Sequence, residues 1–182
     1  MILQEDLEES KRHIERQKEQ EAELKHLSDQ LSQNRHKAIT VLEGELKNLV
    51  TKMGMQDAVF KIELTSSIHF LNNGTDVLTF QFSANKGSDF KDLKKVASGG
   101  ELSRIMLSIK KVLSENTQLP TIIFDEIDTG VSGEVSNKIA AIMQQMSERM
   151  QVITITHIPQ IAAKGNHHYK VFKEEINGKT AT

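Results

Sequence analysis

The stretch TIIFDEIDTGVSG, residues 121–133, decides the fold of this sequence. It opens with apolar and β-branched residues and then reaches the acidic pair Asp125 and Glu126. A second run of this kind, residues 152–156, ends in His157, and a helical repeat of apolar residues lies between the two runs. Continuous apolar strands joined by a helix predict a βαβ unit, whose parallel sheet should be covered on both faces.

The polar residues at these strand ends point to nucleotide triphosphate chemistry. Ligands of open parallel sheets bind at the carboxyl ends of the strands, where Asp125 and Glu126 stand. Ionised carboxylates there are costly without a cation or donors, although polar strand ends can also be structural. We expect Asp125 to contact Mg²⁺ and Glu126 to act as the general base. His157 would lie beside them and reach a γ-phosphate or the attacking water, whereas a lone histidine is usually only polar.

Upstream, Ser98-Gly99-Gly100-Glu101 precedes a helical stripe of apolar residues. The pattern S-x-x-E at a helix start is a capping box, which is the simpler interpretation of these residues alone. The two glycines also leave bare backbone at a helix N-terminus, where N–H groups and the positive end of the dipole attract anions. The same helix start can therefore cap itself and meet a phosphate.

A phosphate-binding loop of the form G-x-x-x-x-G-K-[ST] is missing from the sequence. The GKT at residues 178–180 has Lys173 where the first glycine is required. Asn177-Gly178 is instead a favoured two-residue hairpin turn, here following a predicted strand at residues 169–176. The sequence therefore holds only half of a nucleotide site.

The N-terminal residues 1–53 predict one long, exposed helix, with no proline and a single glycine, Gly44. A helix of this length extends about 70 Å or more. An apolar heptad seam runs along it and then slips to a second set of positions. The seam consists of Leu24, Leu27, Leu31, Ala38 and Val41, followed by Leu42, Leu46, Leu49 and Met53. Such a helix needs a partner, which we expect to be another molecule or a segment upstream of Met1.

Residues 58–82 alternate β-forming residues around Asn72-Asn73-Gly74 and predict a small antiparallel sheet. Residues 83–95 read as a polar loop. The loop's Lys91, Lys94 and Lys95 are a candidate DNA contact or equally a solvated segment, since the 182-residue chain has a net charge of −2. Cysteine is absent, which excludes disulfides and cysteine zinc sites and fits a reducing cytoplasm.

With these residues in view, the sequence resembles the C-terminal part of the RecN family of bacterial DNA repair proteins. These are relatives of the structural maintenance of chromosomes (SMC) proteins and have an ABC-type ATPase head. The similar segments are KVASGGELSRIMLSIK at 95–110, TIIFDEIDTGVSG at 121–133 and THIPQIAA at 156–163. They resemble the ABC signature, the Walker B strand with its D-loop, and the histidine switch.

The resemblance implies an α/β fold, namely the C-terminal lobe of an ABC-type ATPase head with an N-terminal coiled-coil helix. Residues 1–53 would be the returning strand of an antiparallel coiled coil, and residues 54–182 the lobe. The Walker A lobe, the Q-loop and the outgoing coiled-coil strand are missing from this sequence. The resemblance therefore implies that the chain alone is inactive.

The family also implies site residues and partners. ATP and Mg²⁺ would be bound in the complete head, with catalytic Glu126 and His157 and metal-binding Asp125. Cofactor-binding residues would be Ser98, Gly99, Gly100 and Glu101, which act in trans, and Asp128, the D-loop residue crossing the dimer interface. Expected partners are the N-terminal Walker A lobe of the same protein, a second head and DNA, with no membrane, in the cytoplasm at the bacterial nucleoid.

Two other functions stay open at this point. One is a chromosome-organising ATPase of the SMC superfamily. The other is a non-catalytic coiled-coil module whose head only mediates assembly. Glu126 argues against the second, because a purely structural lobe has no need of a carboxylate at that position.

Overall fold

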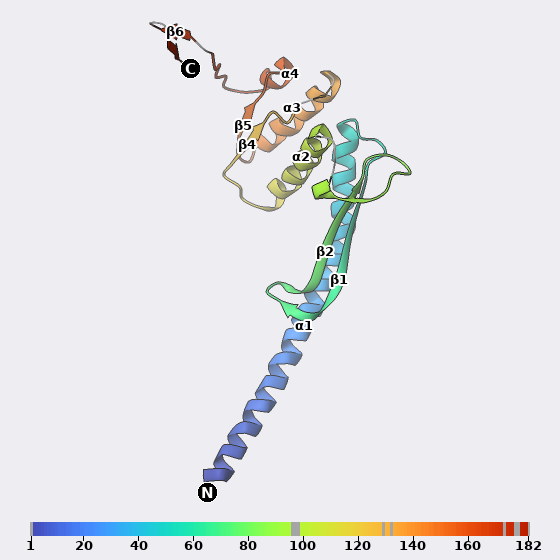
Figure 1. The fold of residues 1–182 in the computed structure, drawn as a ribbon, viewed down its shortest axis with the longest axis vertical. Coiled ribbons are helices and arrows are strands. Elements are labelled where there is room, and N and C mark those ends of the chain that lie inside the picture. Colours follow the sequence, from blue (N-terminus) through green and yellow to red (C-terminus); the bar gives the residue numbers. More distant parts are fainter. Residues whose placement is uncertain are drawn as a thin grey trace. The chain divides into compact units, whose positions relative to one another are not determined.

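The computed structural model describes residues 2–95, 99–128, 130–131, 133–172, 174–176 and 179–181. Its chain is a mixed α/β protein with a long N-terminal helix, an antiparallel sheet and a parallel two-stranded sheet, as predicted (Figure 1). It divides into two compact units. The hairpin unit comprises residues 1–47 and 59–95, and the βαβ unit comprises residues 48–58 and 96–182.

The order of elements follows the sequence prediction closely. The elements are α1 (Ile2–Lys52), β1 (Val59–Leu71), β2 (Gly74–Ser83), β3 (Lys91–Asp92), a 3₁₀ turn (Leu93–Lys95), α2 (Gly99–Asn116), β4 (Thr121–Asp125), α3 (Gly133–Ser147), β5 (Gln151–Ile155), α4 (Pro159–Ala162), β6 (Glu174–Ile176) and β7 (Lys179–Ala181). None of the helices in the described residues is both long and apolar enough to span a lipid bilayer.

Helix α1 is continuous, and the two halves of its apolar pattern have different surroundings. The first half of the predicted seam is exposed, including Leu24, Leu27 and Val41. In the second half Leu46 and Met53 are buried, whereas Leu42 and Leu49 are half-buried. The slip of the heptad therefore coincides with the place where the helix enters the packed part of the chain.

Strands β1 and β2 form the predicted antiparallel hairpin, from the pair Val59↔Ser83 to the pair Leu71↔Gly74. Strand β1 is continuous from Val59 to Leu71, with an irregularity in register between Ser66 and Leu71. The predicted polar loop also contains a short strand, β3, paired with the end of β2. The sequence pattern did not indicate β3, since this strand is only two residues long.

A polar network joins α1 to the hairpin within the hairpin unit. Asp76 is almost fully buried and accepts hydrogen bonds from Arg35 Nη1 and Ser32 Oγ, both at 2.8 Å. Arg35 Nη2 also donates to the carbonyl oxygen of Asn73 at 2.7 Å. The hydrogen bond from Arg35, with that from Ser32, holds the pKa of Asp76 below its ordinary value, while burial opposes the change. The buried carboxylate is thus compensated, as its environment requires.

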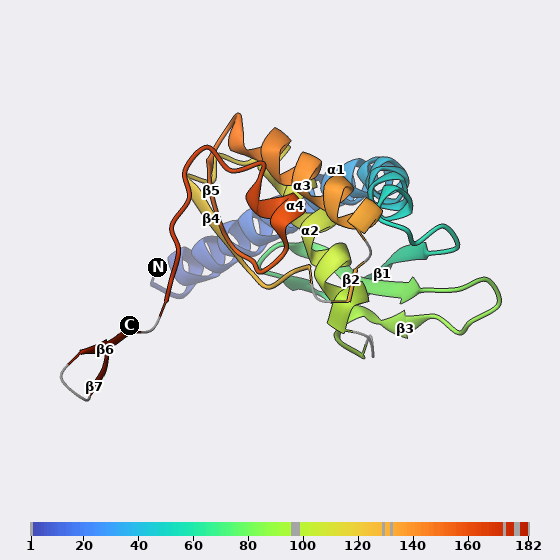
Figure 2. The same ribbon diagram turned by 90° about the horizontal axis from the view of Figure 1, so that it is seen from above.

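In the βαβ unit, β4 and β5 pair in parallel, and α3 lies between them in sequence. Helix α3 buries Ile139, Met143 and Met146, so the methionines of this helix fill the core. Thr154 Oγ1 on β5 contacts Met143 Sδ at 3.6 Å, so α3 covers that face of the sheet (Figure 2).

The prediction of a sheet covered on both faces is wrong for the described residues. Ile123, Ile153 and Ile155 remain exposed, by 63%, 43% and 54%. These residues alternate with the covered ones along the two strands, so they belong to the opposite face. A single connecting helix can cover only one face, which is why the other stays bare.

Two further predictions need correction. On α2 the predicted stripe included Met106 and Leu113, but both are exposed, and Leu107 is buried instead. The predicted strand over residues 169–176 is limited to β6, which pairs with β7 through Ile176↔Lys179. Asn177 and Gly178 lie outside the described residues, and Lys179 and Thr180 belong to strand β7, as the hairpin interpretation of the GKT required.

The polar network predicts a specific loss of stability in the hairpin unit. Replacement of Arg35 by Met leaves the Asp76 carboxylate buried without its cation and should lower the free energy of unfolding by about 1.5–3 kcal/mol. Urea denaturation followed by circular dichroism measures the loss. The control is Arg16→Met on the exposed part of α1, which should change stability by no more than about 0.5 kcal/mol. Equal effects of the two substitutions would contradict the role of the network.

The same network predicts a pH dependence with a defined sign. Because the pKa of Asp76 is lowered from 3.8 on folding, its stabilising effect is complete above that value and is lost as the pH falls through the folded pKa. The stability difference between the wild type and Asp76→Asn should be constant from about pH 5 to pH 7 and should narrow below about pH 4. Denaturation curves of both proteins at several pH values measure it, and a difference that widens in acid would contradict the assignment.

Candidate functional site

The register of the parallel strands brings the predicted acidic pair and histidine to one edge of the sheet. Asp125, the last residue of β4, pairs with Ile155, the last residue of β5. Glu126 follows the first strand directly, and His157 comes two residues after the second. All three predicted side chains, Asp125, Glu126 and His157, are exposed. They are therefore accessible to a ligand at this edge.

Glu126 has a backbone conformation that is unusual for its residue type. Its φ is 46°, in the left-handed region, and no other non-glycine residue described has a positive φ. Its backbone N–H donates to the carbonyl oxygen of Ile155 at 3.0 Å, which continues the pairing beyond the end of β4. A left-handed conformation costs an L-residue about 1–2 kcal/mol. Such strain is often found at functional sites.

Asp128, two residues further on, is buried in its own chain, with a relative exposure of 1%. Its Oδ2 accepts a hydrogen bond from the hydroxyl of Thr156, and its Oδ1 has no hydrogen-bond partner among the described residues. The same Thr156 oxygen accepts a hydrogen bond from the backbone N–H of Ile158 at 3.0 Å. Asp128 is thus joined to the segment that carries His157, and its expected part at a dimer interface stays a prediction.

The signature residues come from a different element, the start of α2. Ser98 lies outside the described residues, so its capping role stays a prediction. Gly99 is exposed, and a Cβ built on it would meet no atom within 4 Å. Gly100 and Glu101 are half-buried in the first turn. The open surroundings of Gly99 are compatible with an anion approaching the helix start.

One charged side chain near the signature was not singled out in the sequence. Arg104 is half-buried, and its Nε is buried with no hydrogen-bond partner in the described part of the chain. Burial lowers the pKa of its guanidinium, and the nearby Glu101 carboxylate acts in the opposite direction. Nothing in the sequence pattern marks this arginine, because its burial arises only from packing.

The described residues contain no cluster of three or more acidic or histidine side chains that could hold a metal ion. Asp125 offers a single exposed carboxylate at the strand end. This fits Mg²⁺, which is usually bound by one or two carboxylates together with phosphate oxygens and water. A single carboxylate is too few ligands for a metal ion that is held entirely by protein side chains.

Other candidates from the sequence are solvated. Lys91 and Lys95 are exposed, while the side chain of Lys94 lies outside the described part. The histidines read as solvent-facing are indeed exposed, namely His13, His26, His36, His167 and His168. None of these observations tests a contact with DNA.

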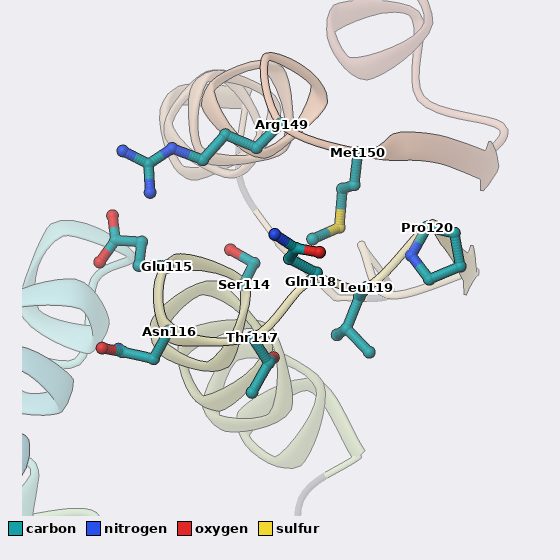
Figure 3. Close-up of a pocket in the computed structure, with 9 residues that line it drawn as sticks. All are labelled: Ser114, Glu115, Asn116, Thr117, Gln118, Leu119, Pro120, Arg149 and Met150. Carbon is teal, nitrogen blue, oxygen red and sulfur yellow. The ribbon is translucent and has the colours of Figure 1, made fainter.

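A groove of about 820 Å³ lies at the other edge of the parallel sheet (Figure 3). It is lined by residues 114–120, which join α2 to the start of β4, and by Arg149 and Met150, just before β5. The hydroxyl of Ser114 and the amide of Asn116 already donate to carbonyl oxygens of α2. The groove is therefore distinct from the strand ends that carry the acidic pair.

Comparison with curated proteins identifies the relatives of this chain. It is 35% identical over 170 residues to the DNA repair protein RecN of Haemophilus influenzae, a match that covers 93% of this chain and 30% of that protein. It is 40% identical over 152 residues to RecN of Bacillus subtilis, with 78% and 26% covered. The predicted resemblance to RecN is confirmed. The chain spans only about 30% of the length of the RecN proteins it matches, and no family model matches it.

Solved structures support the fold of this RecN-like chain. The Smc head domain of Pyrococcus yayanosii, with a coiled coil and joint, superposes with a TM-score of 0.56 and 19% identity, covering 72% of this chain and 24% of that one. The Smc head of Pyrococcus furiosus, with an extended coiled coil and bound to the C-terminal domain of ScpA, gives 0.55 and 18%, covering 72% and 31%. At these identities the similarity shows the fold alone: the chain has the architecture of part of an SMC head.

The strained backbone of Glu126 leads to a prediction on stability. Glycine adopts positive φ without strain, so Glu126→Gly should leave the RecN-like chain as stable as before or slightly more stable. Asp125→Gly removes the neighbouring carboxylate at a strand position and should lower stability by about 0.5–1 kcal/mol. Thermal unfolding of the two variants tests the difference. A larger loss for Glu126→Gly than for Asp125→Gly would contradict the strain.

Proposed function

We propose that this chain is the C-terminal lobe of the ATPase head of a RecN-like DNA repair protein. Residues 54–182 form the lobe, and residues 1–53 form the returning helix of an antiparallel coiled coil. The observation that carries the proposal is the pairing of Asp125 with Ile155, because it gathers two carboxylates and a histidine at one sheet edge. The similarity to RecN over most of the chain supports it.

In the proposed reaction, water attacks the γ-phosphorus of ATP and releases ADP and phosphate. Glu126 accepts the proton of the attacking water, for which an exposed carboxylate beside the nucleotide is suitable. Asp125 would hold the Mg²⁺ that accompanies ATP, and the cation would neutralise negative charge on the phosphates. His157 donates a hydrogen bond to the γ-phosphate or orients the water.

The start of α2 contributes to a nucleotide held by another head. Ser98, Gly99, Gly100 and Glu101 form a signature that approaches the phosphates in trans, and Asp128 belongs to the adjoining D-loop. The open space around Gly99 supports this, because a phosphate can reach the backbone N–H groups there. ATP binding would in this way couple two heads.

The N-terminal lobe, with its Walker A loop, completes the head from another part of the same protein. The uncovered face of β4 and β5, with Ile123, Ile153 and Ile155, supports this part of the proposal. Such a bare apolar face on a parallel sheet usually marks a missing layer. The RecN relatives are more than three times as long as the matched segment, which leaves room for that lobe.

The biological role we propose is repair of DNA double-strand breaks in the bacterial cytoplasm, at the nucleoid. The curated relatives are DNA repair proteins by name. ATP binding and hydrolysis would drive the engagement and release of heads on DNA. The exposed Lys91 and Lys95 are the only candidates for a DNA contact that the sequence suggested and the described residues present.

The proposal predicts how one substitution at Glu126, the proposed general base, changes ATP turnover. In a protein that carries this chain together with the N-terminal lobe, Glu126→Gln keeps the size of the side chain but cannot accept a proton. ATP turnover should fall by a factor of about 10²–10⁴ while ATP still binds. Steady-state turnover and ATP affinity are measured side by side.

The matched control is Glu148→Gln, the same change at an exposed site outside the strand-end edge. It should leave turnover unchanged. Near-normal turnover in Glu126→Gln would refute the assignment of the base. If neither the wild type nor the control hydrolyses ATP, the non-catalytic assembly module replaces the proposed ATPase.

A further inference from the structure

We propose that Thr156 is a positioning residue, which ties the segment carrying His157 to Asp128 and so sets where His157 stands relative to Glu126. The inference rests on the proposed ATPase and adds to it a residue that does not touch the nucleotide. Thr156 stands directly before the histidine in the sequence, and its side chain is half-buried.

The hydroxyl of Thr156 makes two hydrogen bonds at once. It donates to Asp128 Oδ2 and accepts from the backbone N–H of Ile158 at 3.0 Å. The second bond spans two residues and encloses His157 in a side-chain turn. The backbone on both sides of the histidine is therefore held by one oxygen atom.

The acceptor of the first bond is itself well anchored. Asp128 is 1% exposed, so its carboxylate has little freedom to move. Burial strengthens the hydrogen bond that Asp128 accepts, because the dielectric of a protein interior is low. The backbone N–H of Val131 also donates to the carbonyl oxygen of Asp128 at 3.3 Å, which holds the backbone of Asp128.

A second hydrogen bond joins the same two segments as the bond between Thr156 and Asp128. The backbone N–H of Glu126 donates to the carbonyl oxygen of Ile155 at 3.0 Å. The pair of bonds links residues 126–128 to residues 155–158 at two points. Glu126 and His157 are exposed, and these two hydrogen bonds set the relation of their backbones.

The contacts of Asp128 and Thr156 indicate a role in function rather than in stability. The second oxygen of Asp128 is buried without a partner among the described residues, and an unsatisfied buried oxygen lowers stability. An apolar pair at these positions would avoid that loss. Misplacement of catalytic groups by about 1 Å can lower the rate by a factor of 10². The hydrogen bond between Thr156 and Asp128 would therefore matter for catalysis by holding His157 in place.

Three substitutions test the inference in the protein that carries this chain with its N-terminal lobe. Thr156→Val keeps the branched shape and removes the hydroxyl, and kcat should fall by about 10–100-fold with KM for ATP changed less than about threefold. Thr156→Ser keeps the hydroxyl and should recover most of the lost kcat. Thr154→Val removes a half-buried hydroxyl two positions earlier, which contacts only Met143 Sδ, and should leave kcat unchanged.

A double-mutant cycle distinguishes a positioning role of Thr156 from a merely structural role. If Thr156 acts through Asp128, the effects of Thr156→Val and Asp128→Ala on kcat should not add, whereas independent effects would add. The folded fraction of each variant is measured by circular dichroism, and kcat is expressed per folded molecule. Additive effects, a wild-type kcat in Thr156→Val, or a serine variant as slow as the valine variant would each overturn the inference.

The Glu126→Gln variant separates this inference from the proposed function. If Glu126→Gln turns over at a normal rate, the assignment of the site is wrong and the positioning role falls with it. If Glu126→Gln is inactive while Thr156→Val is as fast as the wild type, only the positioning role of Thr156 is wrong.

Discussion

The parallel pairing of β4 with β5 is the constraint on which the candidate site depends. In-register pairing from Thr121↔Gln151 to Asp125↔Ile155 ends both strands at one edge. A slip of one residue would turn every side chain of β5 to the other face of the sheet, because side chains alternate along a strand. The hydrogen bond from Glu126 to Ile155 extends this pairing into the loops that carry the polar side chains. Strand register therefore determines the chemistry available at the edge.

The hairpin unit depends on polar rather than apolar contacts at the outer part of α1. Ser28, Ser32 and Arg35 lie on one face of the helix, at spacings of three and four residues, and each bonds to the second strand of the hairpin or its turn. The exposed leucines of the seam lie beside this face, since Leu24 stands four residues before Ser28 and Leu31 four residues before Arg35. One helix thus presents two neighbouring surfaces. The polar surface has its hydrogen-bond partners within the chain, and the apolar seam is available to a partner helix. Buried charge pairs of this kind often specify register more than they add stability.

Apolar surfaces remain bare in the described residues, and two of them fit a chain that matches a segment of longer relatives. The seam of α1 and the free face of β4 and β5 each carry several exposed aliphatic side chains. The GKT near the C-terminus, which could have suggested a phosphate loop, has its Lys179 and Thr180 in a strand instead. The proposed nucleotide chemistry of this chain therefore rests on the strand ends and the start of α2.

The sequence by itself determined the element types, the parallel βαβ unit and the neighbourhood of Asp125, Glu126 and His157. These follow from local periodicity and from the rule that parallel strands end at a common edge, so no knowledge of packing was needed. It did not reveal the short strand β3, or that the α2 stripe is partly exposed, because both depend on which surfaces meet. Only the tertiary structure decided that Asp128 is buried, that Thr156 binds it and that Glu126 has a positive φ. Burial, side-chain pairing and backbone strain arise from contacts between distant segments, and a linear pattern does not encode them.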